Sequence, residues 1–340
     1  MRLLITGGCG FIGTNFVYLM QERHPDWRIF NLDKLTYAGN RKNLIALEQD
    51  DTSGYTFIHG DICDKDFVTS VLHDYKIDAV VNFAAESHVD RSISDPAPFL
   101  TTNTLGAQNL MECARNARIE KFVHVSTDEV YGTLGLDDPA FTEENPLEPN
   151  SPYSASKAGA DLMARAYFET YKFPVSITRC SNNYGPYQFP EKLIPLMFIK
   201  ATSGEQLPIY GDGSNIRDWI YVDDHCTGVE LTLLKGRPGQ AYNFGGAAEK
   251  TNLELVKELL TILGKDESLI TYVKDRPGHD MRYAMDYALA EKELGFAPAT
   301  TFEQGIRKTI EWYQKNAQWL EEVRSGAYRE FMDHWYGERK

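Results

Sequence analysis

The sequence predicts an α/β fold in which a doubly wound parallel sheet is followed by a smaller C-terminal α/β region. Short apolar runs alternate with helical stretches up to Cys180, a pattern typical of parallel strands joined by crossover helices. A glycine-rich turn separates the first apolar run from the first helical stretch. Beyond Cys180 the alternation gives way to loop-like segments punctuated by Pro190 and Pro195. The 340 residues can bury a large core in one or two domains.

Six apolar runs have the length of buried strands, and the longer stretches between them have helical periodicity. In such a sheet the functional side chains gather at the carboxyl ends of the strands. We expect strands at 3–6, 29–32, 55–59, 79–83, 122–125 and 175–179, and helices at 65–74, 98–117 and 154–171.

The C-terminal half contains an amphipathic stretch at 251–263, where Thr251 and Asn252 can cap the start of a helix. A turn is expected at 211–215. The last residues carry aromatic side chains at helical spacing, which predicts packing against the body of the protein. These aromatic residues are Trp312, Tyr313, Trp319, Phe331 and Trp335.

The charge and the cysteines narrow the classes of function. The formal net charge is −14, so nucleic acids and anionic membranes would be repelled overall. No apolar stretch approaches the roughly 18 residues of a membrane helix, and the N-terminal apolar run is too short for a signal peptide. The five cysteines are scattered without CxxC spacing, which disfavours a disulfide framework and a zinc site. We therefore expect a cytoplasmic protein without a metal site.

The glycine-rich turn has the features of a dinucleotide site. Gly7, Gly10 and Gly13 have the spacing GxxGxxG between a predicted strand and a predicted helix. Such a turn lets the backbone approach a pyrophosphate at the positive N-terminus of the helix. Asp33 follows Gly13 at about the twenty-residue offset of a ribose-binding acid, and its carboxylate would repel a 2′-phosphate. The sequence therefore favours a Rossmann-type domain that binds NAD rather than NADP.

Two further strand ends extend this site. Asp61 and Ile62 follow the third predicted strand, where they can flank the adenine. Ala84, Ala85 and Ser87 follow the fourth, where they can line the central part of the cofactor.

A proton-abstracting pair follows the dinucleotide site. Tyr153 and Lys157 lie one helical turn apart, on one face of a predicted helix. A free tyrosine has a pKa of about 10, and the charges of Lys157 and an oxidised nicotinamide would favour the phenolate. Tyr153 can then take a proton from a substrate hydroxyl. Thr127, at the end of the fifth predicted strand, can hold the same oxygen.

Asp128 and Glu129 add two carboxylates that the oxidation of an alcohol does not need. Elimination beside a ketone needs a base and an acid in close reach, and two adjacent carboxyls in different environments can divide these roles. Burial and its charged neighbour would raise the pKa of Asp128 and make it the acid. These two additional carboxylates predict an enzyme that oxidises an alcohol and then eliminates a neighbouring group.

The sequence resembles the extended short-chain dehydrogenase/reductase family, and within it the dTDP-glucose 4,6-dehydratases, over nearly its whole length. The acid pair Asp128-Glu129 after Thr127 is the most specific element, because related 4-epimerases lack it. Cys9 replaces the more usual alanine of the glycine loop. The shared segments are TGGCGFIG at 6–13, LDKLTYAGN at 32–40, HGDICD at 59–64, FAAESHVDRSI at 83–93, STDEVYG at 126–132, NSPYSASKAG at 150–159, TRCSNNYGPYQFPEKLIP at 178–195, LPIYGDG at 207–213, RDWIYVDDH at 217–225 and RPGHDMRY at 276–283.

The resemblance implies a redox-neutral reaction on one bound NAD. Tyr153 would deprotonate the C4 hydroxyl while hydride passes to the cofactor, Glu129 would remove the C5 proton, and Asp128 would protonate the departing C6 hydroxyl. Hydride would return to C6, giving a 4-keto-6-deoxy sugar nucleotide. The resemblance further implies an NAD-binding domain at 1–180, to which segments near 218–245 return, and a mainly sugar-nucleotide-binding region at 181–340. It adds Phe11, Ile12, Lys34, Thr36 and Thr102 to the cofactor site, along with Tyr153 and Lys157.

The substrate site is also implied by the resemblance. Arg217 and Arg282 could make forked contacts to the second pyrophosphate, with Lys192 as a point charge. Tyr210 could stack on the base. His88 beside this region more readily fits a structural role. The remaining residues expected around the substrate are Ser87, Thr127, Asn182, Leu193, Pro208, Ile209, Asn252, Arg276 and His279.

The family also implies a homodimer that pairs through the helices at 103–117 and 154–171. We expect Leu110, Met163, Ala166 and Tyr167 to be the outward apolar residues of these helices.

Three alternatives stay open at this point. A sugar-nucleotide 4-epimerase would use the same tyrosine, lysine and threonine, but it needs no acid for a leaving hydroxyl. A 4,6-dehydratase could act on another nucleotide sugar, because one methyl group on a base is worth only a few kcal/mol. A non-catalytic NAD-binding regulator could share the fold, although every catalytic position is filled here. The pathway that uses the product, rhamnose or another deoxysugar, is equally open.

Overall fold

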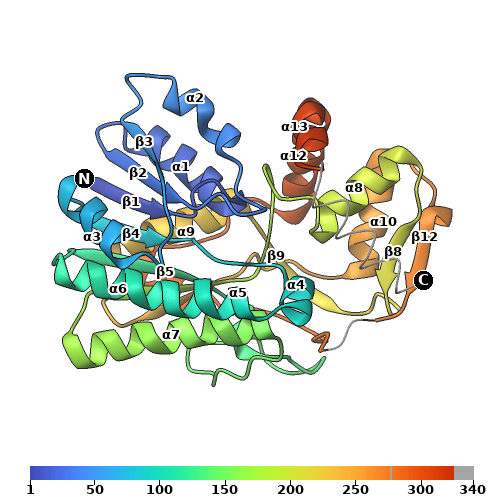
Figure 1. Ribbon diagram of the computed structural model, residues 1–340. Helices are drawn as coiled ribbons and strands as arrows, with labels where there is room; N and C mark the ends of the chain where they lie inside the picture. The colour runs from blue at the N-terminus through green and yellow to red at the C-terminus, as the bar shows by residue number, and fades with distance from the viewer. Residues whose placement is uncertain (276–277, 325–340) are drawn as a thin grey trace.

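The computed structural model describes residues 1–275 and 278–324. Its centre is a seven-stranded parallel sheet with the strand order β10-β6-β5-β4-β1-β2-β3 (Figure 1). The strand order reverses between β1 and β4, which opens a crevice at the carboxyl edge of the sheet. The doubly wound parallel sheet that the sequence predicts is thus confirmed. The strands are β1 (Arg2–Thr6), β2 (Arg28–Asp33), β3 (Tyr55–His59), β4 (Ala79–Asn82), β5 (Lys121–Thr127), β6 (Val175–Cys180) and β10 (Ala241–Phe244).

Helices cover both faces of this sheet. Leu3 and Leu4 show why the strands are apolar without interruption: neighbouring side chains point to opposite faces, and each belongs to a different core. Leu4 lies in the core under α3, α6 and α7, and Leu3 in the core under α1 and α9. The long helices α6 and α7 lie side by side on the first face (Figure 1). The bounds are α1 (Phe11–Arg23), α3 (Lys65–Asp74), α6 (Ala107–Asn116), α7 (Pro152–Tyr171) and α9 (Val222–Lys235).

The helix expected at 98–117 is interrupted. It consists of α5 (Ala97–Phe99), a π-helical segment η2 (Leu100–Gly106) and α6. Within η2, the Asn103 side chain exchanges hydrogen bonds with the backbone of Glu86 at 2.8 and 2.9 Å and donates to Ser156 Oγ at 2.8 Å. The first two bonds tie the π-helical turn to the loop after β4, and the third ties it to α7. Such turns are frequent at functional sites.

The C-terminal half forms a smaller α/β region with its own apolar core. The predicted start of the helix near Thr251 is confirmed, because Thr251 and Glu254 form a capping box before α10. A three-stranded sheet joins β7 (Asn182–Tyr184), β9 (Ile216–Tyr221) and β11 (Glu249–Thr251), and a two-stranded sheet joins β8 (Leu207–Tyr210) and β12 (Ile270–Val273). The longer helices are α8 (Leu193–Ser203), α10 (Asn252–Leu263), α12 (Phe302–Lys315) and α13 (Ala317–Val323). The shorter elements are η1 (Arg41–Leu44), α2 (Ile45–Glu48), α4 (Val89–Ser94), η3 (Asp128–Tyr131), η4 (Glu267–Leu269) and α11 (Ala288–Leu294).

The aromatic C-terminal helices pack on the body of the protein, as predicted. The rings of Trp312 and Trp319 lie 4.6 and 6.0 Å from the ring of Tyr187. The Trp319 indole donates to Asn43 Oδ1 at 2.7 Å, which ties α13 to the segment after β2. The predicted aromatics Phe331 and Trp335 lie outside the described residues.

All five cysteine thiols are free. Within 1–275 and 278–324, no helix combines the length and apolarity needed to cross a bilayer.

Candidate active site

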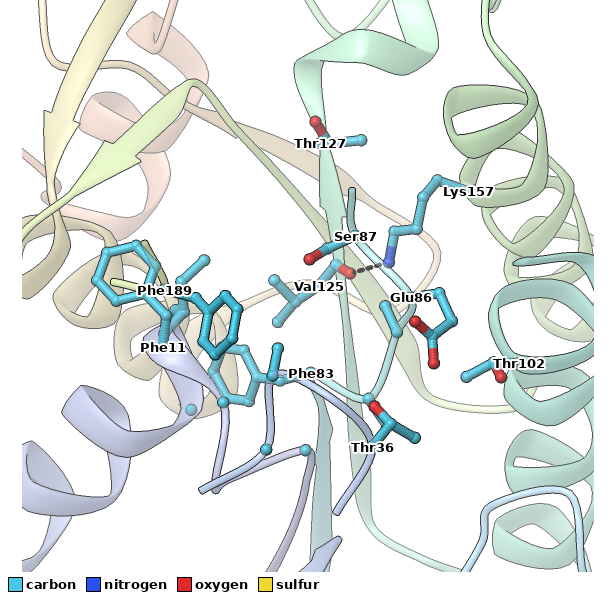
Figure 2. A pocket seen from close by; sticks show the side chains of 18 of the residues that line it. Phe11, Thr36, Phe83, Glu86, Ser87, Thr102, Val125, Thr127, Lys157 and Phe189 are labelled. Atoms are coloured by element: carbon cyan, nitrogen blue, oxygen red, sulfur yellow. Dashed lines mark hydrogen bonds between the residues drawn. The ribbon is translucent and has the colours of Figure 1, made fainter. Parts of the chain in front are cut away.

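Two adjoining cavities open at the carboxyl edge of the large sheet. The larger has a volume of about 280 Å³ and extends from the glycine loop to α7. The smaller, of about 160 Å³, lies between α4 and the C-terminal region. Both are lined by Glu129, Asn182, Glu191 and Lys192, so a ligand in one would meet a ligand in the other at this shared wall. Figure 2 shows Phe11, Phe83 and Phe189 on one side of the larger cavity, with Lys157 and Glu86 on the other.

The glycine loop is shaped for a pyrophosphate. Gly7 has φ +74°, and a Cβ there would lie 2.6 Å from the Ala84 backbone nitrogen. A Cβ on Gly13 would lie 2.3 Å from the carbonyl oxygen of Gly7. Gly10, the N-cap of α1, provides no side-chain hydrogen bond to the first backbone N–H groups of that helix. These N–H groups at the positive end of a helix form a site for an anion.

Replacing Gly13 by alanine is expected to weaken NAD binding about tenfold or more and to lower the melting temperature, because the added methyl group displaces the Gly7 carbonyl. Isothermal titration with NAD+ and thermal unfolding measure the two effects. Gly10→Ala is expected to disturb the fold of the loop less, since a Cβ there lies 3.3 Å from the same oxygen. An NAD affinity of Gly13→Ala equal to that of the unsubstituted protein would contradict the role of the glycine loop.

Asp33 ends β2 beside this loop. Its carboxylate accepts hydrogen bonds from the backbone N–H groups of Cys9 and Leu35, both at 2.8 Å. Burial raises the pKa of the Asp33 carboxyl, and the two backbone bonds oppose this. Lys34 Nζ pairs with Asp61 Oδ2 at 2.7 Å, which joins the ends of β2 and β3. The arrangement fits a ribose hydroxyl pair and opposes a second phosphate.

The structure brings all the residues expected around the cofactor into the lining of the larger cavity. They come from the carboxyl ends of neighbouring strands, from the start of α1, from η2 and from α7, as the crevice of such a sheet requires. They are Gly7, Gly10, Phe11, Ile12, Gly13, Asp33, Lys34, Thr36, Asp61, Ile62, Ala84, Ala85, Ser87, Thr102, Tyr153 and Lys157.

Tyr153 and Lys157 occupy successive turns of α7, whose start is fixed by a capping box between Ser151 and Ser154. Lys157 Nζ donates to the carbonyl oxygen of Val125 on β5 at 2.6 Å (Figure 2). Burial lowers the pKa of the Lys157 ammonium to about 8. Burial raises the pKa of the Tyr153 phenol well above its usual value, repulsion from the Glu129 carboxylate adds to this, and a hydrogen bond with Thr127 opposes it. Tyr153 is therefore protonated at rest and needs added positive charge to act as a base.

Asp128 and Glu129 begin the short helix η3 directly after β5. Thr127 caps this helix through the N–H of Glu129 and also donates to Asp128 Oδ1 at 3.1 Å. Asp128 is 2% exposed, and its Oδ2 has no hydrogen-bond partner. Burial raises the pKa of this carboxyl well above its usual value, and repulsion from Glu129 adds to the effect. The expected direction of the shift is found, and it favours the protonated form of Asp128.

The smaller cavity contains most of the residues expected around the substrate. Tyr210 OH donates to Asp90 Oδ2 at 3.2 Å, and Lys192 Nζ donates to the Ser87 carbonyl oxygen at 2.8 Å. The Arg217 guanidinium is buried, and its NH2 donates to the carbonyl oxygen of Asp280 at 2.9 Å. Ser87 and Thr127 line the larger cavity. The other expected residues in the smaller cavity are Asn182, Leu193, Pro208, Ile209, Asn252 and His279.

The structure does not bring Arg282 to either cavity. Its guanidinium pairs with the Glu249 carboxylate, Nε to Oε2 at 2.6 Å, and NH1 donates to the Asp138 carbonyl oxygen at 2.7 Å. An isolated bridge pairs Arg282 with Ile216, the neighbour of Arg217. Because successive side chains of a strand alternate in direction, this pairing directs Arg282 away from the face of Arg217. Arg276 lies outside the described residues.

Several lining residues could not be recognised from the sequence. Gln188 and Phe189 line the larger cavity, Asp90 and Trp219 line the smaller one, and Glu191 lines both. Glu191 directly precedes Lys192, which was expected at the substrate site, and this adjacency is the sequence signal that could have identified it. His88 accepts a hydrogen bond from the N–H of Arg91 at 3.2 Å and so caps α4, and it also lines the smaller cavity.

Comparisons with known proteins agree with this geometry. A family model described as GDP-mannose 4,6 dehydratase matches residues 4–309. A dTDP-glucose 4,6-dehydratase of Xanthomonas campestris is 51% identical, covering 96% of this chain and 97% of its own. The crystal structure of the dTDP-glucose 4,6-dehydratase DesIV from Streptomyces venezuelae, with NAD bound, superposes with a TM-score of 0.91 at 51% identity, over 95% of this chain and 100% of its own.

A more distant solved structure is the UDP-glucose 4-epimerase of Thermotoga maritima, with a TM-score of 0.86 at 28% identity, over 93% of this chain and 100% of its own. The resemblance inferred from the sequence is confirmed: the chain belongs to the GDP-mannose 4,6-dehydratase family, in which the relatives named here at about half identity are dTDP-glucose 4,6-dehydratases.

Proposed function

We propose that this protein is an NAD-dependent dTDP-glucose 4,6-dehydratase, a hydro-lyase that produces dTDP-4-keto-6-deoxyglucose. One observation carries the proposal: a buried Asp128, whose carboxyl pKa is raised well above its usual value, lies next to Glu129 in the lining of the cavity that also holds Tyr153 and Lys157. A simple alcohol dehydrogenase has no use for that acid. The curated relatives with this activity support the same reading.

The glycine loop and Asp33 would hold the cofactor, and bound NAD+ supplies the hydride acceptor for the oxidation and the donor for the return step. The uncapped N-terminus of α1 would take the pyrophosphate, and Asp33 the adenine ribose. The positive charge of the oxidised nicotinamide would lie in the same cavity as Tyr153 and favour its phenolate.

The oxidation step depends on α7 and the end of β5. Tyr153 takes the proton of the sugar C4 hydroxyl, while Thr127 holds that oxygen in place. The Lys157 ammonium, fixed by the Val125 carbonyl, stabilises the phenolate. The resulting ketone acidifies the C5 proton.

The elimination step depends on η3. Glu129 lies at the wall shared by the two cavities and removes the C5 proton. Asp128 gives its proton to the C6 hydroxyl, which leaves as water. This division of roles follows from environment, since Asp128 is buried whereas Glu129 is partly exposed.

The smaller cavity would hold the nucleoside diphosphate. Arg217 and Lys192 supply positive charge within a chain of net charge −14, and Tyr210 supplies an aromatic ring for the base. The pairing of the buried Asp128 with Glu129 favours the dehydratase over the epimerase alternative, because epimerisation requires no proton for a leaving hydroxyl.

The proposal is tested with dTDP-glucose carrying deuterium at C4 and catalytic NAD+, followed by mass spectrometry of the product. We expect loss of water with the label at C6. An unchanged mass with a galacto isomer would identify an epimerase. No reaction with dTDP-glucose but turnover of another nucleotide sugar would replace the substrate in the proposal.

We further propose that the protein works in the cytoplasm as a homodimer that pairs through α6 and α7. The free thiols suit a reducing compartment. Of the residues expected to face outward, Leu110 and Tyr167 are instead buried in the core of the chain, Met163 packs against that core, and Ala166 is exposed. The exposed apolar side chains of η2 and α7 are Leu100, Leu105, Leu162 and Tyr171, and they supply a face for pairing. A monomer mass in sedimentation at micromolar concentration would contradict the dimer.

A further inference from the structure

A chain of buried polar side chains runs beneath the carboxyl edge of the sheet, on the face covered by α7. Thr6 Oγ1 donates to Asn82 Oδ1 at 2.6 Å, and Asn82 Nδ2 lies 3.2 Å from His124 Nδ1. These residues are neighbours in the register of β1, β4 and β5. Because the amide oxygen of Asn82 is an acceptor here, its NH2 group donates to Nδ1 of the ring. Neutral His124 therefore carries its proton on Nε2.

Asp161 of α7 continues this chain. Its Oδ2 accepts from Arg179 Nε at 2.8 Å, whereas its Oδ1 lies 3.7 Å from His124 Nε2 and has no hydrogen-bond partner. A separation of 3.7 Å is too long for a hydrogen bond. The side chains of Asp161 and His124 are each 1% exposed. A buried carboxylate oxygen without a donor destabilises the fold, so its retention calls for a role beyond packing.

Lys157 lies one helical turn before Asp161 on the same face of α7. Asp161 raises the pKa of the Lys157 ammonium and so opposes the larger lowering by burial. Arg179 is the cation that pairs with Asp161 in this network. His124 adds no charge, since burial lowers its pKa well below the usual value. The other charged or titratable groups that act on this pair are Asp128, Glu129 and Cys180. The shared cavity is also lined by the titratable residues Asp33, Lys34, Asp61, Glu86, Glu191 and Lys192.

We propose that Asp161 is a positioning residue for the proton-abstracting pair: its free carboxylate oxygen keeps Lys157 charged beside Tyr153, and Arg179 anchors that carboxylate. Asp161 lines neither cavity and acts through Lys157. The inference deepens the proposed function and rests on it for the identity of the reaction.

Asp161→Asn tests the inference, because asparagine keeps the shape of the side chain and removes its charge. Lys157 then loses its proton at lower pH, and Tyr153 ionises at higher pH. We expect kcat/KM for dTDP-glucose to fall about tenfold or more at pH 7, which corresponds to a displacement of about one pH unit in the ascending limb. The difference in kcat/KM between the variant and the unsubstituted protein becomes smaller at higher pH, because Lys157 of the unsubstituted protein also loses its proton there.

Tyr131→Phe is the matched control. The Tyr131 hydroxyl accepts from Arg179 NH1 at 2.7 Å and donates to Asn243 Oδ1 at 2.9 Å, in the same buried network. Its removal is expected to lower the melting temperature without moving the pH profile. If Asp161→Asn lowers kcat/KM by the same factor at every pH, its role is structural and the inference is overturned.

A readout without substrate separates the inference from the proposed function. The ultraviolet absorbance of the phenolate, taken as the difference between each protein and its Tyr153→Phe counterpart in the presence of NAD+, follows the titration of Tyr153. We expect this titration to move to higher pH in Asp161→Asn. If Tyr153 titrates at the same pH in both proteins, the inference is overturned, whether or not dTDP-glucose reacts. If the titration moves to higher pH but the unsubstituted protein is inactive on dTDP-glucose, only the proposed function is contradicted.

Asp161→Asn leaves the buried Arg179 guanidinium without its carboxylate, which is strongly destabilising in buried pairs. Should that variant not fold, the same titration is compared between Arg179→Gln and the double variant Asp161→Asn, Arg179→Gln. These two proteins differ only in the Asp161 charge, and in both of them the amide of the introduced glutamine can donate a hydrogen bond to the side chain at position 161. The displacement of the Tyr153 titration is expected between them as well, and coincident curves overturn the inference.

Discussion

Tyr153→Phe is expected to lower kcat by about a thousandfold, because general acid–base catalysis contributes about 10²- to 10⁴-fold. The substitution removes the hydroxyl that takes the C4 proton and keeps the ring, which is buried and lies 6.3 Å from the ring of Phe99. Single-turnover mixing with dTDP-glucose and NAD+ measures the step directly, through the absorbance of the reduced cofactor. Folding and nucleotide affinity, followed by thermal unfolding and titration with dTDP, are expected to stay close to those of the unsubstituted protein. Reduced cofactor appearing at the unsubstituted rate would remove Tyr153 from the role of base.

Asp128→Asn is expected to separate oxidation from elimination. The amide has the size of the carboxyl group but cannot deliver its proton, so oxidation at C4 proceeds while loss of water slows by about 10²- to 10⁴-fold. Reduced cofactor then accumulates on the enzyme during the first turnover. Normal turnover without accumulation would exclude Asp128 as the acid.

Glu129→Gln is the matched variant for the neighbouring carboxylate. In deuterated solvent, Asp128→Asn still exchanges the C5 proton of the oxidised sugar because Glu129 remains, whereas Glu129→Gln does not. Both variants thus stop after oxidation at C4, but C5 carries deuterium in Asp128→Asn and keeps its proton in Glu129→Gln. The raised pKa of Asp128 also sets the sign of the pH dependence: its acid form is lost as the pH rises through that pKa, so elimination slows on the alkaline side.

Every residue that the sequence analysis expected around the cofactor lines the larger cavity, and many of them could be found because they occur near strand ends. Gly7 directly follows an apolar run, Asp33 ends one and Asp61 comes two residues after one, and parallel strands bring such positions to one edge. Tyr153 and Lys157 could be paired for a similar reason, since helical spacing alone puts them on one face. Local periodicity therefore carried most of this prediction.

Contacts between distant segments could not be predicted in the same way. Arg217 and Arg282 both occur in motif segments, but the pairing of Ile216 with Arg282 decides which guanidinium enters the cavity. Leu110 has the apolar character expected of an interface, but α3 and the sheet already bury it. The π-helical turn depends on the hydrogen bonds between Asn103 and Glu86. The spacing of apolar residues in the sequence does not predict these bonds.

Strand β10, the edge strand of the large sheet beside β6, has a consequence for how the chain folds. Between β6 and its partner β10 the chain forms β7, α8, β8 and β9 of the C-terminal region. It then returns to the large sheet with α9, which packs against β5 and β6, before it forms β10. A nascent chain that has emerged only as far as Cys180 already contains every residue of the glycine loop and of α7. Its sheet nevertheless leaves Val123 and Val125 without Val229 and Leu233 of α9, which share their core. Such a chain would expose an apolar sheet face and an unpaired strand edge, both prone to aggregation, so the nucleotide-binding half reaches its closed core only once synthesis has passed Phe244.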